Sequence, residues 1–225
     1  MIRLRATWHI PGGGSAAAAD ALFRESHAPA VQRLPGLARH EVLRSLPNAQ
    51  GGNPAWWRGE HLDFPDDNAL TAAETSPEWP LCWGGDFAAV VAGLRIDVFD
   101  VIEEFSPAAS GEPSAHGPVT ALSGIWQVPA RLTPDEVDPV YLDVHVPNVR
   151  RLPRLQRHTI MRSRDWPDGH YARSWRSAEI RFACEDDFRA VFHSPAYETI
   201  RQDGFNASIV GPDVDIYVIE DAWDR

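Results

Sequence analysis

The chain begins with a regular alternation of apolar and polar residues that changes into a helical pattern. Residues 3–10 carry an apolar side chain at every second position, which predicts a strand with one buried face. Residues 16–33 carry an apolar stripe at helical spacing, and Pro29 is expected to kink or end that helix. Strands are then predicted over 37–46, 56–64 and 94–104, with a second helix, broken by prolines, between 66 and 91. This order, β-α-β-β-α-β, is that of a ferredoxin-like split unit.

The same pattern returns later in the chain at a constant offset. The segment 27–40, HAPAVQRLPGLARH, matches the segment 145–158, HVPNVRRLPRLQRH, without a gap. A single register kept over most of a unit indicates a tandem duplication. The sequence therefore predicts a first domain at 1–105, a linker rich in Pro, Gly, Ser and Ala at 106–118, and a second domain at 119–225.

A single unit of this kind has helices on only one face of its sheet. The other face has to be covered by something else. We expect the two units of this α+β chain to cover each other's bare faces, pairing into an intramolecular dimeric α/β barrel. The chain would then be a monomer that is a pseudo-dimer, although further assembly into a homo-oligomer stays open.

Composition narrows the class of partners. The chain has 32 acidic and 21 basic residues, a formal charge of −11, which disfavours a nucleic-acid partner. No apolar run approaches the ~20 residues of a membrane helix, and the first residues lack the features of a signal peptide. Cys82 and Cys184 lie far apart in sequence, and reduced thiols in a cytoplasm are the simplest interpretation. We expect a cytoplasmic protein that binds a hydrophobic small molecule.

Four histidines are the candidates for catalysis. His27 and His145 end the first helix of each unit, where the helix dipole favours an imidazolium, so each is either an acid–base group at a pocket or a helix cap. His40 and His158 have the strand parity that faces the helices, and are either partners in that chemistry or core histidines held by a backbone carbonyl.

Arginines and tryptophans repeat at the same offset. Arg39 and Arg157 have the opposite parity and are expected to point into the barrel, where Glu41, Glu60 or Glu179 could pair with them. The remaining candidates for substrate contact are the matched pairs Trp8 and Trp126, Trp57 and Trp175, and Arg58 and Arg176. The tryptophans either shape a cavity or fill the core, and the arginines either hold a substrate oxygen or form salt bridges.

Neither a metal nor an organic cofactor is expected. His9, His61 and Asp63 could form a small polar cluster on neighbouring strands, but their spacing is not diagnostic of a metal site. The sequence contains no P-loop, no dinucleotide-binding glycine motif and no CxxC pair.

Several short motifs resemble those of the EthD-like family of dimeric α/β-barrel proteins. They are the helix ending in His27-x-Pro29, the following Leu34-Pro-Gly-Leu37, and Phe192-His-Ser-Pro-Ala-Tyr197. The second copy departs from the family pattern, with Arg154 in place of Gly36, which leaves open whether both units carry a working pocket. The resemblance implies a fold that hosts cofactor-free lyases, isomerases and monooxygenases of aromatic or polyketide-like molecules, and also haem enzymes.

These observations lead to one expected function and two alternatives. The expected function is a cofactor-independent lyase or isomerase in which histidine moves a proton of a hydrophobic, aromatic or polyketide-like substrate, with His27 and His40 as the main pair. The alternatives are a non-enzymatic binding or stress protein for an apolar ligand, and a cofactor-free oxygenase.

Overall fold

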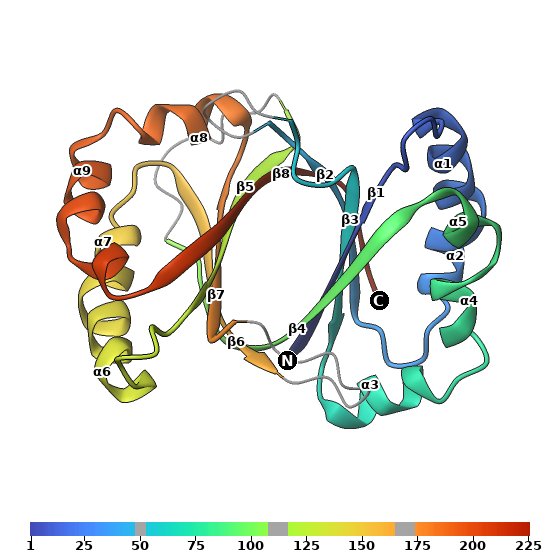
Figure 1. Ribbon diagram of the computed structural model, residues 1–225, viewed down its shortest axis with the longest axis horizontal. Coiled ribbons are helices and arrows are strands. Elements are labelled where there is room, and N and C mark those ends of the chain that lie inside the picture. The colour runs from blue at the N-terminus through green and yellow to red at the C-terminus, as the bar shows by residue number, and fades with distance from the viewer. Residues whose placement is uncertain (48–52, 108–116, 165–173) are drawn as a thin grey trace. The chain divides into compact units, whose positions relative to one another are not determined.

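The chain folds into two compact units. The computed structural model describes residues 1–47, 53–107, 117–164 and 174–225 (Figure 1). One unit consists of Met1–Asp100 together with Glu220–Arg225, and the other of Val101–Ile219. Most of the expected linker, residues 108–116, lies outside the described residues, and the domain bounds 1–105 and 119–225 stay a prediction.

The first unit has the expected order of elements, with both of its helical stretches divided. Its elements are β1 (Ile2–His9), α1 (Ala16–Leu22), η1 (Phe23–His27), α2 (Ala28–Val31), β2 (Arg39–Ser45), β3 (Arg58–Phe64), α3 (Asp67–Glu74), α4 (Trp79–Trp83), α5 (Gly85–Val90) and β4 (Ala92–Phe105). The second helical stretch is divided around its prolines, as the sequence predicts, because proline removes a helical hydrogen bond.

The second unit repeats this order. Its elements are β5 (Val119–Gln127), α6 (Pro134–Pro139), η2 (Val140–His145), α7 (Val146–Val149), β6 (Leu155–Arg164), β7 (Arg176–Phe182), α8 (Glu185–Val191), α9 (Pro195–Gln202), η3 (Phe205–Ala207) and β8 (Val210–Asp224). A capping box formed by Thr133 and Glu136 is present at the start of α6.

Each unit contains an antiparallel sheet with its helices on one face (Figure 1). The strand order is β4-β1-β3-β2 in the first unit and β8-β5-β7-β6 in the second. In β1 the side chains of Leu4, Ala6 and Trp8 are buried on the helix-covered face, as their alternation predicts. The polar residues between them are buried as well, so the expectation that only one face of this strand is buried is wrong. The fold is therefore mixed α and β with two similar units. The expected pairing of the two units into one barrel stays a prediction.

The end of β8 belongs to the first unit. Within this unit the Arg225 backbone N–H donates to the Ala38 carbonyl over 2.9 Å, and Arg58 Nη1 lies 2.8 Å from Glu220 Oε2. In the same way the end of β4, Val101–Phe105, belongs to the second unit, where Glu103 pairs with Arg150 at 2.7 Å. Each unit is thus completed by a strand end that lies far from the rest of it in sequence.

A π-helical segment interrupts the first helical stretch of each unit and ends at a histidine. In η1 the Ala28 N–H donates to the Phe23 carbonyl, five residues back. Pro29 follows, and its ring has no N–H to donate and crowds the carbonyl four residues before it, which favours a locally wider helix. The sequence predicts the irregularity at this proline, but the structure gives it a form that re-aims His27.

No helix among the described residues is both long and apolar enough to cross a bilayer.

The loop before β2 requires a left-handed residue in the first unit. Gly36 has φ +74°, and a Cβ there would lie 2.8 Å from the Ala69 Cβ at the start of α3. Arg154, at the same place in the second unit, keeps a left-handed φ of 62° and forms an ion pair of 2.5 Å with Asp187. The backbone of this loop is therefore retained although the glycine is not.

Candidate functional site

Three buried side chains meet between the helices and the sheet of the first unit. His27 Nε2, from η1, lies 3.2 and 3.1 Å from the two carboxylate oxygens of Glu60 in β3. His40 Nε2, from β2, lies 2.9 Å from Oε2 of the same carboxylate. The exposed fractions are 2% for His27, 1% for His40 and 0% for Glu60. We call these three residues the His-Glu-His triad.

The register of the sheet explains why these residues meet. Glu60 lies opposite Ala6 of β1 and Val42 of β2, so it shares the helix-covered face with them. His40 is two residues before Val42 in β2 and therefore lies on the same face. The expectation that His40 faces the helices is confirmed, and its partner is a carboxylate rather than a backbone carbonyl.

Glu60 is held as an anion. Burial by itself raises its pKa, but the charge and hydrogen bond of His27, followed by those of His40, lower the pKa to about 2. A carboxylate only accepts hydrogen bonds, so each histidine donates its Nε2–H to Glu60. The Nδ1 atoms of His27 and His40 are buried and have no hydrogen-bond partner among the described residues. Glu60 thus occupies Nε2 of both rings and leaves each buried Nδ1 without a hydrogen-bond partner among the described residues.

Aromatic rings surround His27. The ring centroid of His27 lies 4.5 Å from that of Phe87, 5.0 Å from Phe23 and 5.2 Å from Trp8. Trp83 lies at 6.3 Å, and its indole N–H is buried with no hydrogen-bond partner in the described part of the chain. The triad therefore stands in an apolar, aromatic environment with one unused donor beside it.

The nearby Cys82 thiol is not activated. Burial, and then the negative charge of Glu60, raise its pKa to about 12. A thiol becomes a nucleophile only as a thiolate, so Cys82 at neutral pH is an apolar part of this environment.

Sequence reasoning did not include Glu60 among the site residues. It named Glu60 as a possible partner of Arg39, which is wrong because the two residues lie on opposite faces of the sheet. Glu60 has the parity of Leu62 and Phe64, which are buried, and that parity is the signal that could have placed it beside His40.

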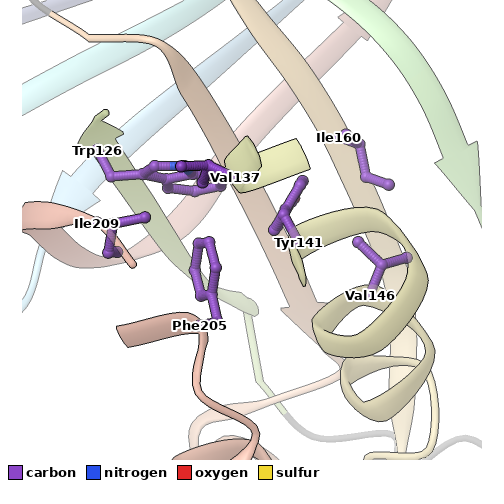
Figure 2. Close-up of a cluster of buried hydrophobic side chains, with 7 residues drawn as sticks. All are labelled: Trp126, Val137, Tyr141, Val146, Ile160, Phe205 and Ile209. Carbon is purple, nitrogen blue, oxygen red and sulfur yellow. The ribbon is translucent and has the colours of Figure 1, made fainter. Parts of the chain in front are cut away.

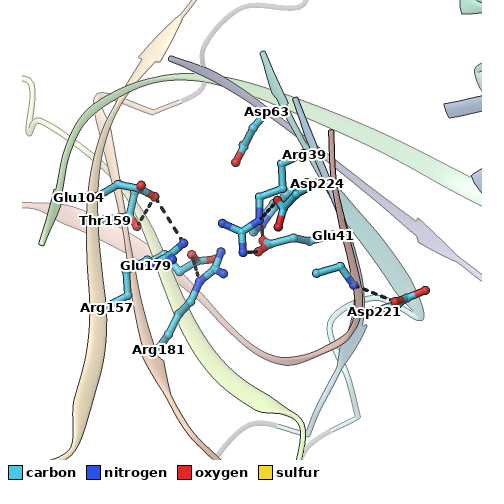
Figure 3. A network of polar contacts seen from close by, with 12 residues as sticks. Arg39, Glu41, Asp63, Glu104, Arg157, Thr159, Glu179, Arg181, Asp221 and Asp224 are labelled. Atoms are coloured by element: carbon cyan, nitrogen blue, oxygen red, sulfur yellow. Dashed lines mark hydrogen bonds and ion pairs between the residues drawn. The ribbon is translucent and has the colours of Figure 1, made fainter. Parts of the chain in front are cut away.

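The arginines of the other face pair locally. Arg39 Nη2 lies 2.8 Å from Glu41, and its Nε lies 3.3 Å from Asp224 (Figure 3). Arg157, in the second unit, lies 3.8 Å from Glu104 rather than beside Glu179. The prediction of charged partners is confirmed for Arg39 with Glu41, and it is wrong for Arg157 with Glu179.

Glu179 has other partners within its own unit. Arg181 Nε lies 2.5 Å from its carboxylate, and the Tyr217 hydroxyl also donates to it. Figure 3 shows Arg181 directed toward Glu179, with Arg157 and Thr159 directed toward Glu104. These contacts compensate the burial of the charges on this face of β6 and β7.

The second unit has the two histidines but no carboxylate between them. Ala178 holds the register position of Glu60, opposite Gly124 of β5 and Ile160 of β6. His145 instead uses its Nδ1, which lies 2.9 Å from Asp203 Oδ2 at the end of α9. His158 is 1% exposed, and its Nδ1 has no partner among the described residues. The two units therefore carry different sites.

Both histidines of the second unit favour their neutral form. Burial lowers the pKa of His145, although Asp203 acts against this. Burial, then the positive charge of Arg150 and that of His145, lower the pKa of His158 to about 3.

The core beside Ala178 is filled by apolar side chains. Figure 2 shows Trp126 above Phe205, with Tyr141, Val146 and Ile160 nearby. Trp126 and Tyr141 have ring centroids 4.9 Å apart, and Ala178 packs against this cluster. Trp8 and Trp126 are each 3% exposed, so both pack in the core of their units, and a role of either in substrate contact stays a prediction.

The arginines that follow the other tryptophan pair form salt bridges. Arg58 lies 2.6 Å from Asp20 and 2.8 Å from Glu220, and its guanidinium stands 5.2 Å from the ring centroid of Trp57. Arg176 forms two bonds of 2.7 Å with Asp138, and Trp175 donates to the same carboxylate over 3.2 Å. The structural role expected as an alternative is present, and a role of these residues in substrate binding stays a prediction.

His9, His61 and Asp63 do not gather. His9 is exposed, His61 Nδ1 lies 3.2 Å from Glu41, and Asp63 pairs with Arg3 at 2.7 Å. Over residues 1–47, 53–107, 117–164 and 174–225, no group of three His, Cys, Asp or Glu side chains has the arrangement of a metal site.

Comparison with solved structures places this fold among known ones. An anthrone oxidase-like protein matches with a TM-score of 0.69 at 10% identity, over 99% of this chain and 92% of its own. A candidate monooxygenase from Fusobacterium nucleatum subsp. nucleatum matches with a TM-score of 0.64 at 8% identity, over 100% and 94%. At such identities the likeness concerns the fold alone.

The family assignment is less specific. An EthD-family protein from Bacillus halodurans C-125 matches 43% of this chain and 95% of its own, at 21% identity and a TM-score of 0.37, which is too low to support an argument. No model of a known protein family and no curated protein matches this chain. Membership of the EthD-like family therefore stays a prediction.

Proposed function

We propose that the first unit carries the active site of an enzyme that moves a proton of a hydrophobic, aromatic or polyketide-like small molecule without a cofactor. The observation that carries this proposal is the His-Glu-His triad, in which two buried imidazoles share one buried carboxylate and keep their Nδ1 atoms unpartnered. A site without titratable groups close to one another would have favoured a binding protein. The triad brings three titratable groups within hydrogen-bond distance, which favours an enzyme.

Glu60 is the group that sets the protonation of the two rings. By accepting from Nε2–H it favours the tautomer with a lone pair on Nδ1, which is the form that acts as a general base. When Nδ1 of His27 takes a proton from the substrate, the new positive charge lies 3.1 Å from the Glu60 carboxylate. Return of this proton to another atom of the substrate completes an isomerisation, and its return to a leaving group completes an elimination.

The surroundings of His27 suit an aromatic substrate. Trp8, Phe23 and Phe87 present ring faces and edges to the imidazole, and rings of this kind bind flat aromatic molecules. We assign the unpartnered indole N–H of Trp83 to the substrate oxygen on which negative charge develops after proton removal. His40 is the second acid–base group and shares Glu60 with His27.

A cofactor-free oxygenase is the second candidate, and the names of the structural neighbours favour it. One is an anthrone oxidase-like protein and another a candidate monooxygenase. In this reaction the triad removes the same proton, and the resulting substrate anion transfers electrons directly to dioxygen. The two candidates share the proton transfer and differ in whether dioxygen is consumed.

The test is turnover of hydroxylated aromatic compounds, beginning with anthrone, in His27→Gln and Glu60→Gln variants. Glutamine at 27 can still donate a hydrogen bond to Glu60 but cannot take a proton, so the fold is kept. We expect each variant to lose turnover by a factor of about 100 or more, with little change in melting temperature for His27→Gln and a lower melting temperature for Glu60→Gln, which loses a buried carboxylate bound to two histidines. An oxygen electrode separates the oxygenase from the lyase or isomerase.

The matched control is His9→Gln, because His9 is exposed and lies outside the triad. Full turnover in His27→Gln, with loss in the control, would reject the triad as the active site. Tight retention of an aromatic ligand without any turnover would instead support a binding protein.

We also propose that the two units arose by tandem duplication and that their bare faces cover each other, which would make a monomer sufficient. This rests on the shared order of elements and on the constant offset of 118 residues between the matched histidines, 145 − 27 and 158 − 40. Light scattering at increasing protein concentration tests it: a mass that stays at 25.0 kDa supports the proposal, and an obligate dimer contradicts it.

A further inference from the structure

The second unit holds its histidine by the opposite ring nitrogen. His27 in the first unit is bound through Nε2, by Glu60. His145 is bound through Nδ1, by Asp203 at 2.9 Å. A carboxylate accepts the N–H, so the nitrogen left with the lone pair is Nδ1 in the first unit and Nε2 in the second.

Asp203 is fixed in position for this role. Its Oδ1 accepts from the Phe205 backbone N–H at 3.1 Å, and its Oδ2 accepts from Asn148 Nδ2 at 3.4 Å as well as from His145. Its side chain is 2% exposed. A carboxylate held at this many points orients the imidazole and stabilises it once it is protonated, as carboxylates do in His–Asp pairs generally.

The side chain of His145 is less buried than those of the triad histidines. Its side chain is 14% exposed, against 1% for His27, and no partner of its Nε2 is found among the described residues. The ring centroid of Phe205 lies 4.2 Å away and that of Tyr141 5.9 Å away. Ala178 takes the place of the carboxylate to which the corresponding nitrogen of His27 is bound.

We propose that His145 and Asp203 form a second acid–base site that binds phenols, and does so independently of the triad in the first unit. A lone pair on Nε2 favours a ligand that donates a proton. The neighbouring rings of Phe205 and Tyr141 favour a ligand that is aromatic. The phenolic O–H bond breaks, its electron pair stays on oxygen, and the proton forms an N–H bond at Nε2. The products are a phenolate and an imidazolium bound to Asp203, which is the positioning residue.

The first experiment uses 4-nitrophenol, whose phenolate absorbs visible light, added to the full chain at a pH where the free phenol is mostly protonated. We expect an increase in the phenolate band that is lost in His145→Gln. Asp203 acts to raise the pKa of His145, so Asp203→Asn should reduce the bound phenolate about tenfold or more. Asp187→Asn, which changes another buried aspartate of the same unit, is the matched control.

Two outcomes would overturn the proposal directly. One is the absence of any band in the unaltered protein, and the other is a band that survives both His145→Gln and Asp203→Asn. Loss of the band in Glu60→Gln, with the band intact in His145→Gln, would assign the phenolate to the first unit and also reject the second site. Failure of anthrone turnover leaves this result unaffected, so the two proposals are tested separately.

The second experiment needs no variant. Nitrogen-15 spectra of the histidine side chains report which ring nitrogen carries the proton. For His145 at neutral pH we expect the Nδ1–H tautomer, and for His27 the Nε2–H tautomer. An Nε2–H tautomer at His145 would exclude the proposed base, even if Asp203→Asn failed to fold.

Discussion

Glu60 and Ala178 occupy the same register position in the two sheets, opposite Ala6 and Gly124 respectively. In the first unit the carboxylate at this position binds two histidines. In the second unit the methyl group of Ala178 at this position cannot bind either histidine. The larger Ile160 stands in β6 where Val42 stands in β2, so the second unit has more apolar volume at this place. One substitution thus separates a paired acid–base centre from an apolar core with two unlinked histidines.

Glu60 should make the protein sensitive to acid in a defined range. Its pKa is lowered from 4.5 to about 2 in the folded state, so the unfolded state binds the proton first as the pH falls. The stability that this group contributes is present above pH 4.5 and is lost as the pH approaches 2, by about 3 kcal/mol at most. Urea unfolding at pH 5 and pH 3 should show a smaller loss in Glu60→Gln than in the parent. Glu25→Gln, at an exposed position, is the control, and an identical loss in both variants would contradict the argument.

His158 should make the stability of the protein depend on pH in a higher range than Glu60 does. Its pKa is lowered from 6.5 to about 3, which means that the folded state keeps the ring neutral while the unfolded state takes up a proton. Stability is therefore lost as the pH falls from 6.5 toward 3. His158→Leu should flatten this part of the stability profile, measured by thermal melting between pH 7 and pH 4. The exposed His193, changed to Gln, is the control; a profile as steep in His158→Leu as in the parent would show that the ring is not held neutral.

Arg58 should matter for stability rather than for substrate binding. Its side chain is 4% exposed and pairs with Asp20 and Glu220, so Arg58→Met leaves two acidic groups without their main cation. Because the side chains of Asp20 and Glu220 are 36% and 26% exposed, water compensates part of the loss, and we expect a cost of about 1–3 kcal/mol. Arg24 lies 3.8 Å from the same Asp20 but is 69% exposed, and Arg24→Met should cost less than about 1 kcal/mol. Equal stabilities of the two variants in urea, with a weaker ligand affinity in Arg58→Met, would favour the substrate-binding role.

Gly36 should be intolerant of a side chain for two separable reasons. Gly36→Ala would force a left-handed φ on alanine, at about 1–2 kcal/mol, and would press its Cβ against Ala69. Gly13 has a similar φ of +83°, and a Cβ added there would meet no atom within 4 Å, so Gly13→Ala measures the backbone term alone. The free energy of unfolding should fall further for Gly36→Ala than for Gly13→Ala by about 1–3 kcal/mol. A smaller loss at Gly36 would mean that α3 moves away at little cost.

The local pattern of the chain predicted most of the elements and their faces. The alternation around Trp8 and the parity of His40 depend only on neighbours in sequence, and both were predicted correctly. The division of the first helix at Pro29 was expected for the same reason, although the π-helical form of η1 was not. Side-chain parity in β3 also contained the information that Glu60 faces His40, but Glu60 was named only as one of three possible partners of Arg39 and Arg157.

The sequence by itself determined the repeated order of strands and helices, the histidines that end η1 and η2, and the face on which each strand residue lies, because these follow from periodicity and proline over a few residues. Only the tertiary structure decided which groups bind these histidines. Glu60 lies 33 residues from His27, and Asp203 lies 58 residues from His145, and contacts over such separations depend on how helices pack on a sheet. The same histidine motif therefore offers Nδ1 in one unit and Nε2 in the other, since the acidic partner comes from a strand in the first case and from the end of a helix in the second.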